Sequence, residues 1–295
     1  MAMYEKKYVE LKNEKLAYIE AGSGDKTVVL IHGNFTSSFS MYPFYERCKP
    51  GMRIIGFDLR GFGDSSYNNR FDTLDELAED VIEAIEKLNL GKVHLVGWSL
   101  GGAVCMKVAA KAQDLVASMS LIQSGSYRGY PIFQRDKKYR EIYGRIYPSK
   151  EQLALDPIVV LPLLQAYEQK DRTFLDDIKK VSTWSKNRPS KEICDEYIDE
   201  QLKQRNLVDA DWALANFNMS NYSNIYNLGT NDIHDVKCRV YMTYATADTV
   251  VTQKMTEENI QALNPAVVKV YENEGHQVLF DRPDEVVGDI FNFIG

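Results

Sequence analysis

The sequence predicts an α/β fold in which helices cover both faces of a mostly parallel sheet and a helical segment is inserted late in the chain. Strand and helix patterns alternate through the first 122 residues, as in proteins with a parallel sheet. The alternation stops after Ser124, a tyrosine-rich region with helical patterns follows, and the strand pattern resumes at Arg239. We therefore expect an α/β core formed by residues 1–124 and 237–295 and a helical cap formed by residues 125–236.

The strands expected in the first part are short and apolar. Residues 7–11 (KYVEL) and 15–22 (KLAYIEAG) are predicted to pair as an antiparallel hairpin around Asn13 and Glu14. Four later runs are nearly continuous in apolar residues, as strands buried on both faces of a sheet are. These runs are 28–32, 53–58, 93–98 and 117–123.

The clearest helix is predicted over residues 74–88. Its apolar residues recur at the i, i+3, i+4, i+7 spacing of one buried face: Leu74, Leu77, Ala78, Val81, Ile82, Ile85 and Leu88. Thr73 and Glu76 have the spacing of a capping box, which favours a helix start at this point. Gly91 follows the last apolar residue, where helices commonly end.

Helical patterns dominate residues 125–236, where we expect no buried strand. Pro157, after Asp156, predicts the start of a helix, and further helices are expected near 172–184, 190–204 and 209–217. After the cap we expect a strand at 239–245, a helix at 253–263, a strand at 267–271 and a closing helix from Pro283 to Phe293.

The composition excludes several classes of partner. The 295 residues carry a net charge of −7. This argues against nucleic acid as a partner, because proteins that bind it neutralise the phosphates with Lys and Arg. No stretch reaches the roughly 18 uncharged apolar residues needed to span a bilayer, and the first residues lack the apolar region of a secretory leader. Without a CxxC pair, the four cysteines indicate neither disulfides nor a zinc site. We expect a cytoplasmic protein without metal or cofactor, and the oligomeric state stays open.

The strongest chemical signal is the run GWSLGG at residues 97–102, which follows a buried strand and begins a helix. A serine at such a turn is exposed above the sheet, at the amino end of a helix where negative charge is favoured. Glycine at positions 97 and 101 relieves the steric conflict that side chains would create in so tight a turn. Ser99 is therefore predicted to be a nucleophile. The alternative is a bystander serine in a glycine-rich turn.

A serine hydroxyl needs a base to remove its proton, and the chain offers four histidines. His94 lies inside a strand, and His234 lies in the segment that leaves the cap. His32 is expected to brace the loop after its strand through hydrogen bonds. His276 follows the last strand in a loop that can reach the carboxyl edge of the sheet, so we predict that it is the base.

The histidine needs a carboxylate that holds its tautomer and stabilises the imidazolium. In a nucleophile-elbow enzyme this residue lies between serine and histidine in chain order. Asp248 fits because it comes just after the strand at 239–245. A loop aspartate is more often a turn former, but the position of Asp248 relative to Ser99 and His276 favours the catalytic interpretation.

Ester cleavage also needs hydrogen-bond donors for the oxyanion of the tetrahedral intermediate. One is expected to be the backbone N–H of Leu100, which follows the nucleophile. The other should come from the loop after the strand at 28–32, and we predict the backbone N–H of Asn34, with Phe35 as the fallback. Gly33 lets this loop approach the substrate.

The run DLRGFGDSS at residues 58–66 is interpreted as structural. It leaves the end of a strand and contains glycines suited to positive φ and polar side chains suited to local hydrogen bonds. We therefore expect a scaffold turn there and not catalytic groups.

These motifs together resemble the α/β-hydrolase superfamily over almost the whole chain. The matching pieces are HGN at 32–34, the D-x-R-G-x-G-x-S turn at 58–65, GWSLGG at 97–102, Asp248 and the Gly275-His276 pair. The resemblance implies an eight-stranded, mostly parallel sheet with a cap inserted after the sixth strand, and the same roles for Asp248 and His276. More narrowly, residues 58–81 resemble bacterial hydrolases identified as intracellular polyhydroxybutyrate depolymerases.

The sequence thus predicts a serine hydrolase that cleaves carboxylic esters of small or short-chain substrates through an acyl-enzyme on Ser99. A polyhydroxybutyrate-type depolymerase or lactonase, a thioesterase, a carbon–carbon bond hydrolase and a perhydrolase remain alternatives, because the same triad serves all of them. A non-catalytic protein that senses a ligand is the alternative from another class. In the cap, tyrosines are candidates for a substrate pocket, although packing of helices is the plainer role for each: Tyr127, Tyr130, Tyr139, Tyr143 and Tyr147.

Overall fold

The order of the strands determines which loops meet at the carboxyl edge of the sheet. In the computed structural model, which describes residues 3–182, 184 and 186–295, eight strands form one sheet in the order β1-β2-β4-β3-β5-β6-β9-β10. Strand β2 is antiparallel to β1 and to β4, and the remaining neighbours are parallel. The strands are β1 (Lys7–Glu10), β2 (Lys15–Gly22), β3 (Lys26–Ile31), β4 (Met52–Phe57), β5 (Val93–Trp98), β6 (Val116–Ile122), β9 (Arg239–Ala245) and β10 (Val267–Tyr271).

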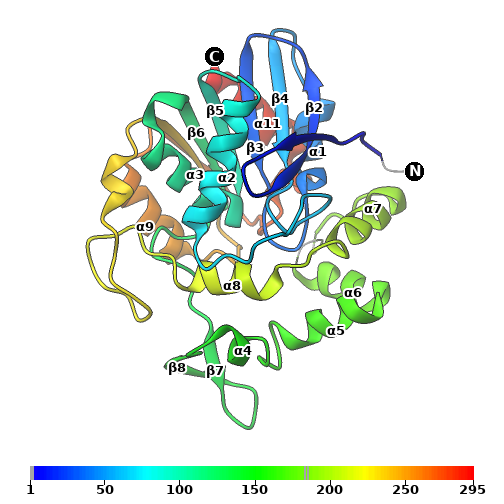
Figure 1. Cartoon of the computed structure of the whole chain (residues 1–295), viewed down its shortest axis with the longest axis vertical. Helices are drawn as coiled ribbons and strands as arrows, with labels where there is room; N and C mark the ends of the chain where they lie inside the picture. Colours follow the sequence, from blue (N-terminus) through cyan, green and yellow to red (C-terminus); the bar gives the residue numbers. More distant parts are fainter. Residues whose placement is uncertain (1–2, 183, 185) are drawn as a thin grey trace.

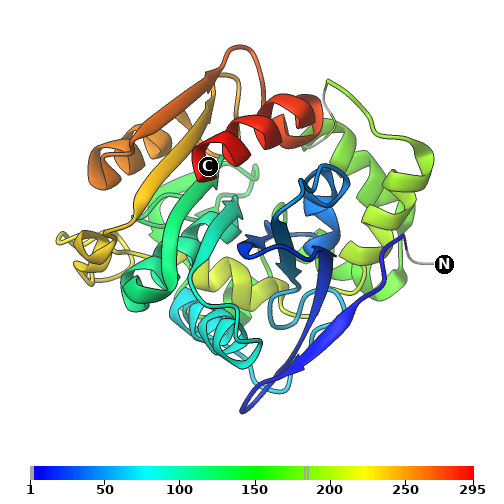
Figure 2. The ribbon, with the colours of Figure 1, turned by 90° about the horizontal axis from the view of Figure 1, so that it is seen from above.

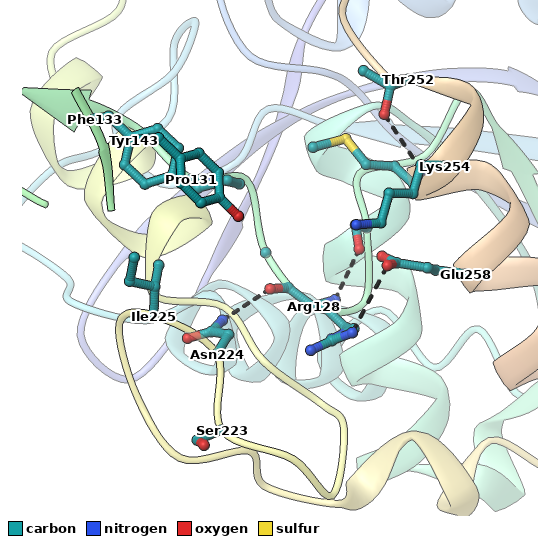
Figure 3. Close-up of a pocket in the computed structure, with 13 residues that line it drawn as sticks. Arg128, Pro131, Phe133, Tyr143, Ser223, Asn224, Ile225, Thr252, Lys254 and Glu258 are labelled. Atoms are coloured by element: carbon teal, nitrogen blue, oxygen red, sulfur yellow. Dashed lines mark hydrogen bonds and ion pairs between the residues drawn. The ribbon is translucent and has the colours of Figure 1, made fainter. Parts of the chain in front are cut away.

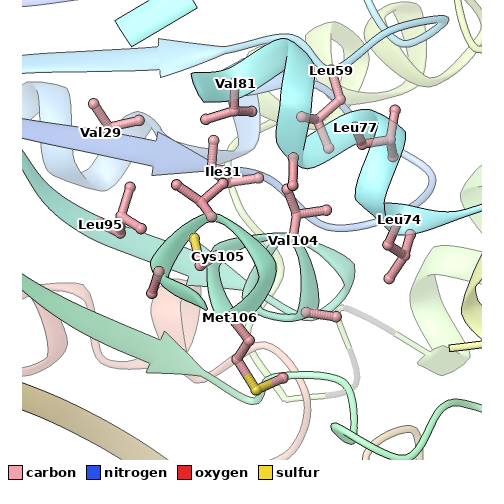
Figure 4. Packing of buried hydrophobic residues seen from close by; sticks show 14 of the residues in the cluster. Val29, Ile31, Leu59, Leu74, Leu77, Val81, Leu95, Val104, Cys105 and Met106 are labelled. Atoms are coloured by element: carbon pink, nitrogen blue, oxygen red, sulfur yellow. The ribbon is translucent and has the colours of Figure 1, made fainter. Parts of the chain in front are cut away.

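The helices of the core cover both faces of this sheet (Figures 1 and 2). On one face, α2 and α3 pack on alternate strand residues such as Val29 and Ile31, as Figure 4 shows. On the other face, α1 and α11 pack on residues such as Val28 and Leu30. Each central strand is therefore buried on both sides, as its apolar run predicts. These helices are α1 (Tyr42–Glu46), α2 (Leu74–Lys87), α3 (Leu100–Lys111), α9 (Gln253–Leu263), α10 (Val278–Asp281) and α11 (Pro283–Ile294).

Local sequence explains where α2 begins. The Thr73 side chain accepts a hydrogen bond from the backbone of Glu76, and the Glu76 side chain accepts one from Thr73 N–H at 3.0 Å. This capping box is the predicted one. The buried residues of α2 include Leu74, Leu77 and Val81, which face the sheet. The predicted amphipathic helix is thus confirmed, with its end at Lys87.

The segment at residues 125–236, which we propose as the cap, lies between β6 and β9 at one end of the sheet (Figure 1). Its helices are α4 (Lys150–Leu153), α5 (Leu161–Gln169), α6 (Arg172–Ser182), α7 (Lys191–Gln201) and α8 (Leu207–Ala215). The predicted helices near 172–184, 190–204 and 209–217 correspond to α6, α7 and α8. Residue 183, in the predicted end of the first, lies outside the described residues. Short 3₁₀ helices lie at Ser38–Met41, Gln113–Leu115 and Asp232–Asp235.

The structure corrects two expectations within the cap. Strands β7 (Phe133–Arg135) and β8 (Glu141–Ile146) form an antiparallel hairpin where a helical pattern was expected. Asp136 closes its turn by accepting from the N–H groups of Lys138 and Arg140. The second correction concerns the helix expected at Pro157. The Asp156 carboxylate accepts two N–H groups in a turn instead, and α5 begins at Leu161.

None of the described helices is both long enough and apolar enough to cross a lipid bilayer.

Candidate active site

Ser99 occupies a strained position at the junction between β5 and α3. Its φ of 54° and ψ of −120° place a non-glycine residue at positive φ, which costs of order 1–3 kcal/mol. Surrounding backbone holds the strain: Ser99 N–H donates to Ile122 O at 3.1 Å, and its carbonyl accepts from Gly102 and Gly125, each at 3.0 Å. Strain maintained in this way is typical of functional positions.

The two glycines that flank the serine are required by contacts with backbone. A Cβ at position 97 would lie 2.5 Å from the carbonyl oxygen of Gly101, and one at position 101 would lie 2.1 Å from that of Ile31. Neither backbone oxygen can move without disturbing the sheet or α3. The predicted steric role of glycine at both positions is confirmed.

His276 and Asp248 meet at the carboxyl edge of the sheet. His276 Nδ1 lies 2.9 Å from Asp248 Oδ2, and both side chains are almost completely buried. The other carboxylate oxygen of Asp248 accepts the N–H groups of Val250 and Val251 at 2.8 and 2.9 Å. A carboxylate beside Nδ1 favours the tautomer with its proton on that nitrogen, which leaves Nε2 as an acceptor.

His276 is also anchored to the residue next to the serine. Trp98 Nε1 donates to the carbonyl oxygen of His276 at 3.2 Å, and the two rings lie 5.6 Å apart between centroids. No hydrogen bond joins Ser99 Oγ to His276 among the hydrogen bonds of the described residues. Catalytic hydrogen bonds are often long in structures without substrate and shorten when it binds.

An apolar cavity of about 130 Å³ lies directly at Ser99. It includes the predicted donors Asn34 and Leu100, and Val250 and Val251 bring in the loop that carries Asp248. Cap residues form the opposite wall. The lining consists of Asn34, Phe35, Ser99, Leu100, Gly125, Tyr130, Ile132, Val159, Asp211, Leu214, Val250 and Val251.

Backbone hydrogen bonding distinguishes the two candidates for the second oxyanion donor. The N–H of Phe35 donates to Asn34 Oδ1 at 3.0 Å and is therefore already engaged. Among the residues that the structure describes, the N–H groups of Asn34 and Leu100 have no hydrogen-bond partner. Both are at the cavity wall. This pattern favours Asn34 over Phe35.

Of the five cap tyrosines named as candidates from the sequence, Tyr130 alone contributes to the cavity at Ser99. Tyr139 and Tyr143 are 59% and 89% exposed. Tyr147 is buried in the cap and donates to Asp156 at 2.8 Å. For Tyr147 the plainer expectation, packing within the cap, is the one that the structure shows, and at the cavity that contains the serine the pocket role applies to Tyr130.

His32 braces its loop as expected. Leu59 N–H donates to His32 Nε2 at 3.1 Å, so Nδ1 carries the proton and donates to Gly33 O at 2.7 Å. Complete burial lowers the pKa of His32 to about 4, which keeps the ring neutral. A neutral histidine with both nitrogens engaged has a structural role.

The turn at residues 58–66 is also structural. Asp58 accepts hydrogen bonds from the N–H groups of Ser38 and Asp64, each at 2.9 Å. Lys6 Nζ lies 2.7 Å from Asp58 Oδ2. Asp58, Asp64 and Glu200 form a cluster whose geometry suits a cation. The Lys6 ammonium lies between these carboxylates, with Glu200 at 2.6 Å and Asp64 at 3.2 Å. The charge that a metal would supply comes from this lysine.

Sequence reasoning missed two buried polar residues beside the cavity, Asp211 and Gln204. Asn34 Nδ2 donates to Asp211 Oδ1 at 2.9 Å, and Gln204 Nε2 donates to Asn34 Oδ1 at 2.9 Å. Burial raises the pKa of Asp211 to about 7. The available signal was an aspartate within the apolar run of α8.

A larger pocket of about 400 Å³ lies between the β7–β8 hairpin and α9 (Figure 3). Its walls mix polar and apolar side chains and include Arg128, whose guanidinium lies 3.8 Å from Glu258. The lining of this pocket does not include Ser99, Asp248 or His276. Ser99 lines the smaller cavity, so the candidate active site is placed there.

Comparisons with known proteins agree with this fold. Residues 26–283 match the family described as alpha/beta hydrolase fold. The (E)-2-((N-methylformamido)methylene)succinate hydrolase of Acinetobacter baylyi is 25% identical over 288 residues, which cover 95% of this chain and 94% of the relative.

Two solved structures show the same architecture. A thermophilic esterase from Thermogutta terrifontis superposes with a TM-score of 0.71 at 19% identity, covering 98% of each chain. The enol-lactonase from Burkholderia xenovorans superposes with a TM-score of 0.70 at 16% identity, covering 98% of this chain and 99% of the other. At these identities the likeness concerns the fold.

Proposed function

The chain belongs to the α/β-hydrolase fold family, and on that premise we propose that it is a serine hydrolase that cleaves carboxylic esters. The observation that carries the proposal is the hydrogen bond of 2.9 Å between His276 Nδ1 and Asp248, together with Ser99, which has a φ of 54° and follows Trp98, the residue that donates to His276 O. A positive φ at a serine costs free energy, and an imidazole paired with a carboxylate is a specific arrangement. A non-catalytic turn needs neither feature.

In the proposed mechanism, Ser99 Oγ attacks the ester carbonyl while His276 Nε2 takes its proton. Asp248 keeps Nδ1 protonated and stabilises the imidazolium that forms. The N–H groups of Asn34 and Leu100 donate to the oxyanion, and the helix α3 begins at the same point, so its amino end favours the negative charge. The alcohol leaves with the proton from His276, and water repeats the sequence on the acyl-enzyme.

The cavity favours small substrates. A volume of about 130 Å³ accommodates a short acyl chain, and the aliphatic walls formed by Val159, Leu214 and Val251 suit an apolar one. We therefore expect hydrolysis of p-nitrophenyl esters to be fastest for acyl chains of few carbons and to fall steeply for long chains.

The test is the rate of p-nitrophenyl ester hydrolysis over a graded series of acyl lengths, in wild type and in Ser99→Ala. The variant is expected to lose at least about 10³-fold in kcat because the nucleophile is removed. Ser23→Ala is the matched control: this exposed serine precedes β3, at the opposite edge of the sheet from Ser99. Equal activity in wild type and Ser99→Ala would overturn the proposal.

The same triad serves lactonases, carbon–carbon bond hydrolases and perhydrolases, so the substrate panel includes a lactone and 3-hydroxybutyrate oligomers. The relative and the two structural neighbours act on different substrates according to their names. Ser99-dependent turnover of the lactone or of the oligomers in preference to simple esters would keep the mechanism and change the substrate. Ligand binding without any Ser99-dependent turnover would favour a sensing role.

A further inference from the structure

We propose that three cap side chains, Lys179, Gln204 and Asp211, position the loop that supplies the second oxyanion donor. This group, called here the clamp, consists of positioning residues, because they act through Asn34 and Phe35. The inference rests on the proposed function and extends it: the cap would complete the catalytic site as well as enclose the substrate.

The clamp fixes the side chain of Asn34 from two directions. Asp211 Oδ1 accepts from Asn34 Nδ2 at 2.9 Å, and Gln204 Nε2 donates to Asn34 Oδ1 at 2.9 Å. Gln204 is itself held, since its Nε2 also donates to Asn206 and its carbonyl accepts from Tyr167. With both ends of the amide bonded, the χ angles of Asn34 are determined, and its backbone N–H is held with them.

The clamp also holds Phe35, whose φ of 60° is unfavourable for an aromatic residue. Its N–H donates to Asn34 Oδ1 at 3.0 Å, and its carbonyl accepts from Lys179 Nζ at 3.3 Å. A strained backbone persists only where the surroundings over-determine it. Of these two bonds, the one from Lys179 comes directly from the cap, and the acceptor of the other, Asn34 Oδ1, is itself held by Gln204.

The three clamp residues come from separate parts of the cap. Lys179 lies on α6, Gln204 lies between α7 and α8, and Asp211 lies on α8. All three are buried. The polar groups of the clamp thus bond to a loop of the core, where an apolar contact would have sufficed for packing. This arrangement couples the docking of the cap to the geometry of the oxyanion donor at Asn34.

The energetic cost of the clamp supports a role beyond stability. Lys179 is buried against the ring of Tyr197 at 4.6 Å, without a carboxylate partner among the described residues. Burial lowers the pKa of Lys179 to about 7. A buried amine of this kind destabilises the fold. Its presence beside the loop of Asn34 and Phe35 is explained by the hydrogen bond that it donates to Phe35 O.

The test is a double-mutant cycle on kcat with p-nitrophenyl butyrate, using Asp211→Leu and Asn34→Ala. Asn34→Ala keeps the backbone N–H but removes the side chain that the clamp holds. We expect Asp211→Leu to lower kcat by about 10- to 100-fold, part of the loss seen when an oxyanion donor is removed, with KM changed less than about threefold. In the Asn34→Ala background the same substitution should change kcat by less than about twofold.

Two further variants separate positioning from folding. Asp211→Asn retains an acceptor for Asn34 Nδ2 and should recover most of the activity lost in Asp211→Leu. Lys179→Met should lower kcat while leaving the protein no less stable to urea at pH 7, since it removes a buried amine.

Several results would overturn the inference. An undiminished kcat in Asp211→Leu and Lys179→Met, a rise in KM alone, or an equal loss of kcat in the Asn34→Ala background would each exclude positioning through Asn34. All of these leave Ser99-dependent turnover in wild type intact. Absence of that turnover would instead overturn the proposed function, and the catalytic role of the clamp with it.

Discussion

The buried amine of Lys179 predicts an unusual dependence of stability on pH. The side chain is 4% exposed, on α6, and its Nζ contacts the Phe35 carbonyl and the Tyr197 ring. Burial lowers its pKa from 10.5 to about 7. The informative perturbation is Lys179→Met, which keeps a long flexible side chain and removes the titrating group.

The sign and size follow from the two pKa values. Between pH 7 and 10.5 the unfolded chain binds a proton at Lys179 that the folded chain does not, so this lysine makes stability rise with pH. A tenfold change in proton affinity is worth about 1.4 kcal/mol, so the whole window corresponds to about 5 kcal/mol. Between pH 7 and 9 the expected change is about 2 kcal/mol.

The assay is urea unfolding of wild type and Lys179→Met at several pH values from 7 to 9.5. We expect Lys179→Met to be the more stable at pH 7 and its advantage to shrink by about 2 kcal/mol at pH 9. Lys180→Met is the matched control, because the neighbouring lysine is exposed and pairs with Asp176 and Asp177. A difference between wild type and Lys179→Met that stays constant across this range would show that burial does not lower the pKa of Lys179.

Three other predictions concern the elbow, the triad and the junction between core and cap. Asp248→Asn should lower kcat about 10⁴-fold by disfavouring the required histidine tautomer, with an unchanged circular dichroism spectrum. Gly101→Ala should lose about 3 kcal/mol in urea unfolding, because its Cβ would meet a backbone oxygen at 2.1 Å. Gly288→Ala, in open space on α11, should gain about 1 kcal/mol. Lys6→Met should lose roughly 3–5 kcal/mol by leaving the buried Asp58 carboxylate without its cation, since Glu200 keeps its pair with Lys203. The exposed Lys7→Met should change stability by less than about 0.5 kcal/mol.

The sheet was predictable because burial on both faces leaves a direct trace in the sequence. The runs at 28–32, 53–58, 93–98 and 117–123 correspond to β3, β4, β5 and β6 within two residues at each end. The positions of Ser99, Asp248 and His276 at strand ends followed from the same pattern, since each comes after a strand whose carboxyl end lies at one edge.

The cap was less predictable because much of it is exposed. Strand β8 has no buried residue, so no alternation of apolar and polar residues marks it. The turn at Asp156 forms because a side-chain carboxylate competes with helical hydrogen bonding, which the Asp-Pro pair alone does not reveal. In both places a local hydrogen bond decided the outcome.

The clamp was not predictable from the sequence. Asn34, Lys179, Gln204 and Asp211 are separated by up to 177 residues along the chain, and each alone is an ordinary polar residue. Only the docking of α6 and α8 on the core brings them together. The cavity shows the same limit, because the sequence could not tell which cap tyrosines line a pocket and which pack, and of the five named only Tyr130 lines the cavity at Ser99.

Covalent trapping tests directly whether Ser99 is a nucleophile activated by His276 and Asp248. Wild type, Ser99→Ala and Asp248→Asn would be treated with a fluorophosphonate and analysed by intact mass and peptide mapping. We expect one adduct, on Ser99, formed rapidly in wild type, absent in Ser99→Ala and slowed by orders of magnitude in Asp248→Asn. An adduct on a different residue, or labelling of Ser99 at the same rate in Asp248→Asn, would contradict this expectation.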